Sequence, residues 1–140
     1  MVLKNTFKVS PSGSPSGANK TIGMYLDTAV KDGGVNAFAA NILDLTAANA
    51  KLVVEKGGIG VYAKNNSPAV DSIIKRVNVS STGNTSVGVF ADGNLKLEQA
   101  GGKITADDKG IGVYGNKGKI TLTAPINLET SKQGITKIGR

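Results

Sequence analysis

Three features of the sequence predict an all-β fold, a right-handed parallel β-helix of about five coils with roughly 24 residues and three short strands each. The first is a recurring order of apolar, Gly, apolar and aromatic residues. The second is the regular spacing of its copies. The third is the alternation of apolar and polar residues in the runs between them. In such a solenoid each strand pairs with its equivalent in the next coil, about 4.8 Å away.

The recurring pattern is clearest in three segments, GIGVYAKNN, SVGVFADGN and GIGVYGNKG. Their central glycines, Gly60, Gly88 and Gly112, are 28 and 24 residues apart. One period further out in each direction lie Asn36, in VNAFAAN, and Thr136, in QGIT, where Gly is replaced. These five anchors predict that the repeat continues through most of the chain.

We call each segment with this recurring pattern a rung. Two segments near the start are candidates for the first rung. TIGMYLD (Thr21 to Asp27) has the full pattern, but its Gly23 precedes Asn36 by 13 residues, about half a period. Either it begins an irregular first coil, or it is the true anchor and the segment from Val30 to Asn41 is an insertion. We expect the first. Residues 1–20, which include SPSGSPSGA, are expected to form an irregular lead-in or linker, and residues 21–140 the β-helix.

Short strands are expected between the rungs, because apolar residues alternate there in runs of three to five. Turn-forming residues separate them, among them Asp92-Gly93 and Gly101-Gly102. An antiparallel meander that uses the Asp-Gly turns as hairpins is the alternative, but it gives no reason for one pattern to recur. The expected strands are KLVVE (51–55), KRVNVS (75–80), NLKLE (94–98), KIT (103–105), KITLT (119–123) and INLE (126–129).

Alternation within each rung predicts which side chains share a face. In IGVYA, Ile59, Val61 and Ala63 lie on one face and Gly60 and Tyr62 on the other. If the aliphatic face is the inner one, two apolar columns form the core. The opposite face then carries the repeat glycines beside an aromatic ladder, although inward-facing rings stay an open alternative. The predicted columns are Ile59, Val87 and Ile111; Val61, Val89 and Val113; and, as the ladder, Phe38, Tyr62, Phe90 and Tyr114.

A repeated Gly within strands indicates that something approaches the backbone closely. The structural interpretation is the neighbouring aromatic ring lying across it. The functional one is a ligand or partner on a shallow aromatic groove.

Composition excludes several chemistries. The 140 residues include no Cys and no His, so a thiol nucleophile, a Ser-His-Asp triad and an ordinary zinc site are ruled out. No cofactor or metal is expected. The acidic residues are scattered, and the closest pair, Asp107 and Asp108, falls in a predicted turn, so we expect no enzyme. The net charge is +7, but the Lys residues are spread singly, which does not indicate nucleic-acid binding.

The glycines at Gly110, Gly112 and Gly115 spell G-x-G-x-x-G, a pattern that binds dinucleotides only within a βαβ unit. No helix is expected after Gly115, so this segment is interpreted as a rung of the solenoid.

The rungs and the segments NLKLEQAGGKIT and GKITLTAPINLE resemble those of large autotransporter (type V secretion) adhesins of Gram-negative bacteria, from about Ala18 to Arg140. The resemblance implies an exported β-helical passenger domain, carried to the cell surface or secreted, in a full-length protein anchored by a C-terminal outer-membrane barrel. It further implies attachment to a receptor, protein or glycan, on host cells or other bacteria. A carbohydrate-binding or carbohydrate-active β-helix fragment is the alternative. Unpaired end strands also predict end-to-end self-association.

Overall fold

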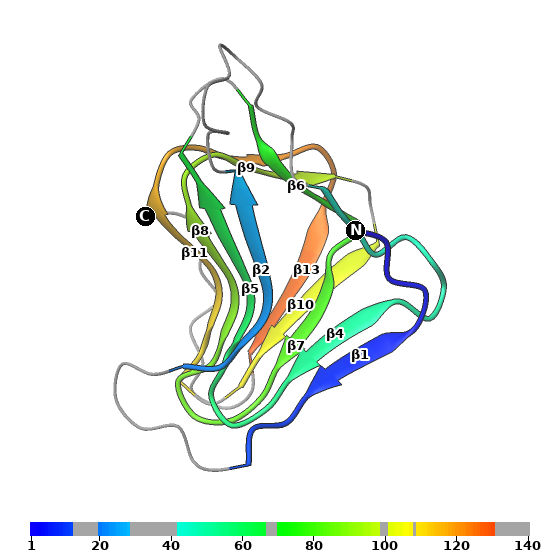
Figure 1. The fold of residues 1–140 in the computed structure, drawn as a ribbon, viewed down its shortest axis with the longest axis vertical. Helices are drawn as coiled ribbons and strands as arrows, with labels where there is room; N and C mark the ends of the chain where they lie inside the picture. The colour runs from blue at the N-terminus through cyan, green and yellow to red at the C-terminus, as the bar shows by residue number, and fades with distance from the viewer. Residues whose placement is uncertain (13–19, 29–41, 67–69, 99–100, 108, 131–140) are drawn as a thin grey trace.

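A computed structural model describes residues 1–12, 20–28, 42–66, 70–98, 101–107 and 109–130. These residues form strands and turns, and they contain no helix of the length and apolarity needed to cross a membrane. The strands follow one another around a three-sided body (Figure 1). Buried apolar side chains from all three sheets form its core. The predicted all-β parallel β-helix is therefore confirmed.

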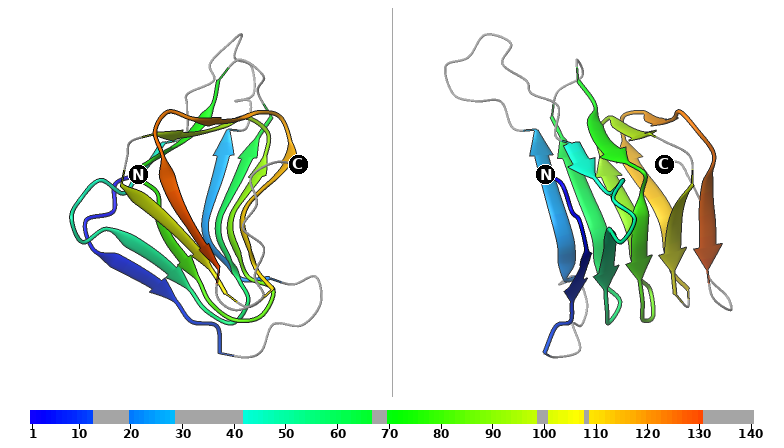
Figure 2. Two further views of the ribbon diagram at one scale, coloured as in Figure 1. Left: turned by 180° about the vertical axis from the view of Figure 1, so that it is seen from behind. Right: turned by 90° about the vertical axis from the view of Figure 1, so that its right-hand side faces the viewer.

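Every third strand along the chain belongs to the same sheet, and every strand pair is parallel. The chain thus passes from sheet 1 to sheet 2 to sheet 3 and returns to sheet 1 one coil further on, and the coils stack along one axis (Figure 2). Sheet 1 contains β1 (Thr6–Val9), β4 (Lys51–Val54), β7 (Asn78–Ser81), β10 (Gly102–Ala106) and β13 (Ile126–Thr130). Sheet 2 contains β2 (Ile22–Thr28), β5 (Ile59–Asn65), β8 (Val87–Asp92) and β11 (Ile111–Lys117). Sheet 3 contains β3 (Ile42–Asp44), β6 (Ser72–Lys75), β9 (Leu95–Glu98) and β12 (Ile120–Leu122).

Residues that pair in register in successive strands form columns along the axis. The inner columns are aliphatic and nearly inaccessible to solvent, and they meet in one core. Full burial of a Val, Leu or Ile side chain contributes about 1.5 to 3 kcal/mol, so these columns provide the main stabilisation of the fold. They include Leu52, Val79 and Ile104 in sheet 1, Val61, Val89 and Val113 in sheet 2, and Leu43, Ile74 and Leu97 in sheet 3.

The lead-in expected over residues 1–20 contains a strand. β1 pairs with β4 in register, with Phe7 beside Leu52 and Val9 beside Val54. An ion pair between Lys8 Nζ and Glu55 Oε1, 2.7 Å apart, adds to this contact. β1 therefore belongs to the first coil, which begins before the expected boundary at residue 20. The sequence did not predict this strand, because the short run TFKV pairs with a strand more than 40 residues away and has no pattern of its own.

The first rung is TIGMYLD, which corrects the expected assignment. β2 pairs with β5 in register from Ile22 opposite Ile59 to Thr28 opposite Asn65. The other edge of β5 is occupied by β8, so no place beside Tyr62 is left for Phe38. Phe38 itself lies outside the described residues, as does the segment 29–41 that separates β2 from β3. The alternative, in which this segment is an insertion into the first coil, agrees with the register.

Lys20 joins the start of β2 to the turns of the next two coils. Its Nζ donates hydrogen bonds to Gly57 O at 2.8 Å, to Thr85 O at 2.8 Å and to Thr85 Oγ1 at 3.1 Å. Partial burial lowers the pKa of this ammonium group. The contacts satisfy two turn carbonyls, including that of Thr85, whose φ of 59° lies in the left-handed region.

Candidate binding surface on sheet 2

The repeat glycines Gly60, Gly88 and Gly112 lie on sheet 2 and face the core. A Cβ on Gly60 would overlap Val79 Cγ1 and lie 2.5 Å from Gly88 O. A Cβ on Gly88 would likewise overlap Ile104 Cγ2 and lie 2.5 Å from Gly112 O. The predicted close approach is therefore real, and side chains of sheet 1, not an aromatic ring, make it. The strands of sheet 2 bow toward the interior (Figure 1). The glycines let the backbone of these strands contact side chains of sheet 1.

This bow interrupts the alternation within each rung and moves one predicted column out of the core. Val61 and Ala63 are buried as expected. The column of Ile59, Val87 and Ile111, which begins at Ile22, does not belong to the core cluster. Ile59 is buried, Val87 and Ile111 are half-buried, and Ile22 is 38% exposed, so the column becomes more exposed toward the outer coils. Since Gly and the following Val are both buried, period-two alternation does not hold across the glycine.

The aromatic ladder lies on the outer side of sheet 2, which decides between the two orientations considered from the sequence. Its rings are Tyr25, Tyr62, Phe90 and Tyr114, at centroid separations of 5.4, 4.8 and 5.2 Å in that order. Tyr25 is 49% exposed and the other three are half-buried. Tyr25 takes the place that Phe38 was expected to take. The residue pattern of TIGMYLD matches the other rungs and could have identified Tyr25, but the 24-residue period indicated Phe38 instead.

Stacking leaves few ring faces open to a ligand. Tyr62 lies between Tyr25 and Phe90, and Phe90 lies between Tyr62 and Tyr114. Sugars and cations bind aromatic side chains over the ring face. The inner members of the ladder therefore offer ring edges and, in Tyr62, a hydroxyl. This favours a partner that packs along the whole ladder over one that stacks on a single ring.

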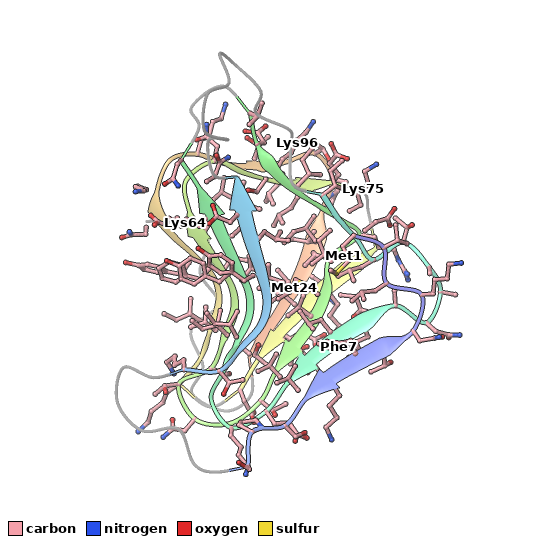
Figure 3. All side chains as sticks on the ribbon, viewed as in Figure 1. Met1, Phe7, Met24, Lys64, Lys75 and Lys96 are labelled. Carbon is pink, nitrogen blue, oxygen red and sulfur yellow. The ribbon has the colours of Figure 1, made fainter. Side chains whose placement is uncertain are left out.

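A column of alternating charge runs beside the ladder on the same face. Asp27 pairs in register with Lys64, and Lys64 with Asp92. Asp92 pairs with Lys117 across a shift in register between Gly115 and Lys117. The Lys117 Nζ to Asp92 Oδ1 distance is 3.4 Å. Lys64 projects from the outer side of sheet 2 in Figure 3. These residues lie at or next to the C-terminal ends of strands of the sheet, whereas the sequence predicted a turn at Asp92.

The charged column touches the ladder at Tyr25. Its hydroxyl donates a hydrogen bond to Asp27 Oδ2 at 3.3 Å. Burial of the ring, and after it the negative charge of Asp27, raises the pKa of the Tyr25 hydroxyl. The outer face of sheet 2 thus combines a partly buried aliphatic column, an aromatic ladder and a column of alternating charge. It is the candidate binding surface.

The acids considered for catalysis are held in a turn or lie outside the described residues. The Asp107 carboxylate accepts a hydrogen bond from Gly83 N at 3.0 Å, and its backbone N–H donates to Ser86 Oγ at 2.8 Å. Asp108 is not among the described residues. In the described part of the chain, no group of three or more acidic residues is arranged to hold a metal ion.

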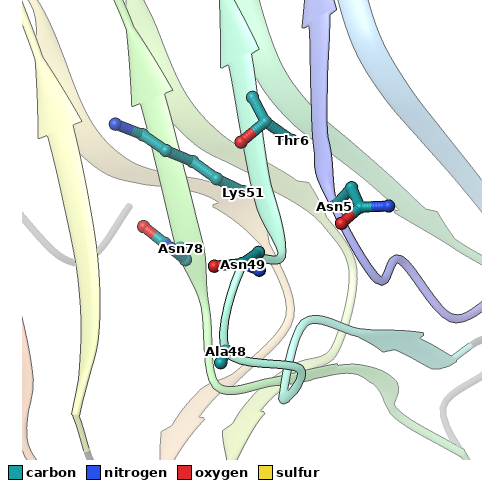
Figure 4. Close-up of a pocket in the computed structure, with 6 residues that line it drawn as sticks. All are labelled: Asn5, Thr6, Ala48, Asn49, Lys51 and Asn78. Carbon is teal, nitrogen blue, oxygen red and sulfur yellow. The ribbon is translucent and has the colours of Figure 1, made fainter.

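An open pocket of about 570 Å³ lies at the start of the sheet 1 strands (Figure 4). Asn78 belongs to this pocket and donates a hydrogen bond through Nδ2 to Ala50 O at 2.9 Å. No feature of the sequence pointed to this pocket, since its residues come from three coils and share no motif. The lining residues are Asn5, Thr6, Ala48, Asn49, Lys51 and Asn78.

Comparisons with known protein families, with characterised proteins and with solved structures find no match to this chain.

Proposed function

We propose that the chain is a non-catalytic adhesive segment of a surface-exposed passenger domain, a β-helical stalk that attaches to host cells or to other bacteria. The observation that carries the proposal is the outer face of sheet 2. There a partly buried aliphatic column that does not belong to the core cluster lies beside a continuous aromatic ladder and charges of alternating sign. Aromatic side chains flanked by charged groups are typical of protein interaction surfaces.

The resemblance of the rungs to those of autotransporter adhesins supports the same proposal. From the same resemblance we propose that the chain is exported and lies on the cell surface or is secreted. We also propose that a C-terminal outer-membrane barrel anchors the full-length protein. The partner is a protein or glycan receptor on a cell surface, and no cofactor takes part.

Binding of the labelled chain to cultured epithelial cells and to bacterial cells tests this function. The double substitution Tyr62→Ser with Tyr114→Ser removes two rings of the ladder and should reduce binding at least tenfold. Ile73→Ser is the matched control, because Ile73 is a half-buried apolar residue on a strand of sheet 3. Urea unfolding of both variants shows whether reduced binding reflects lost contacts with the partner or a loss of folding stability. Equal binding by the double variant and the wild type, or no binding by the wild type, would overturn the proposal.

A second candidate, carbohydrate binding, is favoured by the sheet 1 pocket. Three Asn side chains and one Lys line it, and amides both donate and accept the hydrogen bonds that sugar hydroxyls make. Titration with neutral and acidic oligosaccharides tests this candidate. Asn49→Ala should abolish any binding at the pocket, whereas Tyr62→Ser should leave it unchanged.

A further inference from the structure

The lysines in the described part of the chain differ in how their charge is compensated. Four of them form ion pairs with acidic side chains, and Lys20 donates its hydrogen bonds to turn oxygens. Lys51 of sheet 1 forms neither an ion pair nor a side-chain hydrogen bond with any residue that the structure describes. It lines the sheet 1 pocket, and none of the described residues that line this pocket with it is acidic. The pocket therefore presents a positive charge that no described side chain neutralises.

The walls of the pocket carry side chains that form hydrogen bonds through amides and a hydroxyl. Lys51 pairs in register with Thr6 on one side, and β7, which carries Asn78, lies on the other. In Figure 4 the Lys51 side chain extends from β4 toward β7. Asn49 lines the pocket from the turn between β3 and β4. Asn78 Nδ2 donates to Ala50 O at 2.9 Å, and this bond leaves one N–H and the amide oxygen of Asn78 for a ligand.

The turn that forms one wall of the pocket is held in place by hydrogen bonds within the chain. Arg76, between β6 and β7, donates from Nη1 to Ala47 O at 3.2 Å. Ala50 N donates to the same carbonyl oxygen at 3.0 Å. Thr46 donates to Asp44 Oδ1 from its backbone N at 2.9 Å and from Oγ1 at 2.6 Å. A wall that is already ordered lowers the entropy that is lost when a ligand binds.

We propose that this pocket binds an acidic saccharide, whose carboxylate or sulfate group meets the Lys51 ammonium group and whose hydroxyls meet the asparagine amides. The inference rests on the carbohydrate binding proposed above for the pocket, and it names the class of saccharide. An anionic group accepts a charge-assisted hydrogen bond from the ammonium group, whereas a neutral ligand would cover this charge without pairing it. The amides both donate to and accept from the hydroxyls of the same ligand.

Other classes of ligand fit the lining residues less well. Inorganic sulfate only accepts hydrogen bonds, so it cannot use the acceptor oxygens of Asn5, Asn49 and Asn78. Single-stranded nucleic acids stack their bases on aromatic side chains, and none of the described lining residues is aromatic. A neutral saccharide uses the amides but leaves the charge of Lys51 unpaired. Of these ligands, the acidic saccharide uses both the ammonium group and the amides.

Lys103 provides an internal comparison on the same sheet. It pairs in register with Asn78, and β7 lies between the strands that carry Lys51 and Lys103. Lys103 Nζ lies 2.8 Å from Glu129 Oε2, so its charge is already paired, and Lys103 does not line the pocket. Replacing either lysine by Gln changes the net charge of the chain equally. Only the replacement of Lys51 removes an unpaired charge from the pocket.

Calorimetric titration with acidic tetrasaccharides tests the inference. The tetrasaccharides of hyaluronan and polygalacturonate carry carboxylates, and that of chondroitin sulfate carries sulfates in addition. The methyl esters of the first two are the neutral controls. We expect the wild type to bind at least one carboxylate tetrasaccharide about tenfold or more tightly than its ester, because a hydrogen bond to a charged group is stronger than one between neutral groups. If only the sulfated tetrasaccharide binds, sulfate is the group that meets Lys51.

Two variants assign the preference to the pocket. Lys51→Gln should lower the affinity for the acidic tetrasaccharide to that for its ester, whereas Lys103→Gln should bind as the wild type does. Lys51→Arg keeps the charge and should keep the preference. The comparison of acid with ester in the wild type needs no substitution, so the test stays decisive if Lys51→Gln fails to fold. In the same wild-type titration, NMR signals of the Asn49 and Asn78 side-chain amides should shift, which locates the ligand.

Three results would overturn the inference, and they differ in what they imply for the pocket. Equal binding of acid and ester would exclude a role for the charge and leave the carbohydrate binding proposed for the pocket intact. An equal loss of binding in Lys51→Gln and Lys103→Gln would show attraction to the overall charge and not to the pocket. If no tetrasaccharide binds, acidic or esterified, the inference and the carbohydrate-binding candidate both fail.

Discussion

Gly60 of sheet 2 and Val79 of sheet 1 lie so close that Gly60 has no room for a side chain: an added Cβ would overlap Val79 Cγ1. Gly88 and Ile104 repeat this relationship one coil further on. The absence of a side chain at these two glycines thus permits the close approach of the two sheets. Gly112 differs, because its added Cβ would meet Leu128 Cδ2 at 3.6 Å, an ordinary contact.

Gly60→Ala and Gly88→Ala should therefore destabilise the protein, and Gly112→Ala should not. In the first two the new methyl also lies 2.5 Å from a backbone carbonyl, which cannot turn away. Forcing extra atoms into a packed core costs about 1 to 3 kcal/mol. At Gly112 we expect a change between zero and a gain of about 1 kcal/mol, since Ala restricts the unfolded chain. Urea unfolding measures all three, and equal losses at all three positions would contradict the packing argument.

Ser72 and Ser81 are both buried, but they should respond differently to replacement by Ala. Ser81 Oγ donates a hydrogen bond to Val87 O at 2.9 Å, whereas Ser72 Oγ has no partner among the described residues. Leaving a buried polar group unsatisfied costs about 1 to 3 kcal/mol. Ser72→Ala should therefore raise the free energy of unfolding by about 1 kcal/mol, and Ser81→Ala should lower it by a similar amount. Thermal or urea unfolding checks the sign, and a loss of stability in Ser72→Ala would count against this account.

Attachment of β1 should weaken in acid through Glu55. Hydrogen bonds, first from Lys8 and then from Ser10, hold the pKa of this carboxyl below its ordinary value of 4.5. A carboxyl with a depressed folded-state pKa binds fewer protons in the folded chain. It therefore stabilises the fold above the unfolded pKa, and that contribution is lost as the pH falls through the folded pKa.

Hydrogen exchange of the β1 amides should accordingly accelerate below pH 4.5 in the wild type, after correction for the intrinsic rate. Glu55→Gln should show the weaker attachment already at neutral pH and little further change in acid. NMR titration of the Glu55 carboxyl gives the pKa directly. A value at or above 4.5 would contradict the prediction.

The repeat pattern predicted the architecture well because a solenoid places the same residue types at the same place in every coil. Gly60, Gly88 and Gly112, each followed by a Val and an aromatic residue, are sufficient to predict three successive strands of sheet 2. The first coil could not be predicted by period. Segment 29–41 lengthens that coil, so the first rung lies 37 residues before its partner at Ile59 and not 24. Pairing depends on which side chains stack, and TIGMYLD had the better match.

The orientation of the repeat glycines toward the core could not be predicted from the sequence, for a different reason. Period-two alternation assumes a regular strand, whereas the strands of sheet 2 are bowed (Figure 1) and both Gly60 and Val61 are buried. The outward position of Ile22, Val87 and Ile111 follows from this deviation. The contribution of β1 depends on a pairing distant in sequence, which leaves no pattern within TFKV itself.

Because side chains form in-register columns, the number of coils can also change without changes to the residues within each coil. The strands of a coil pair only with strands of the coil before it and the coil after it, so a duplicated coil would present matching apolar, aromatic and charged residues to both neighbours. Each duplication would lengthen the body by about 4.8 Å and leave the existing packing unchanged. Tandem duplication and loss of whole coils is thus the route of change that this architecture tolerates best, whereas gain or loss of one residue within a strand would reverse every side chain beyond it.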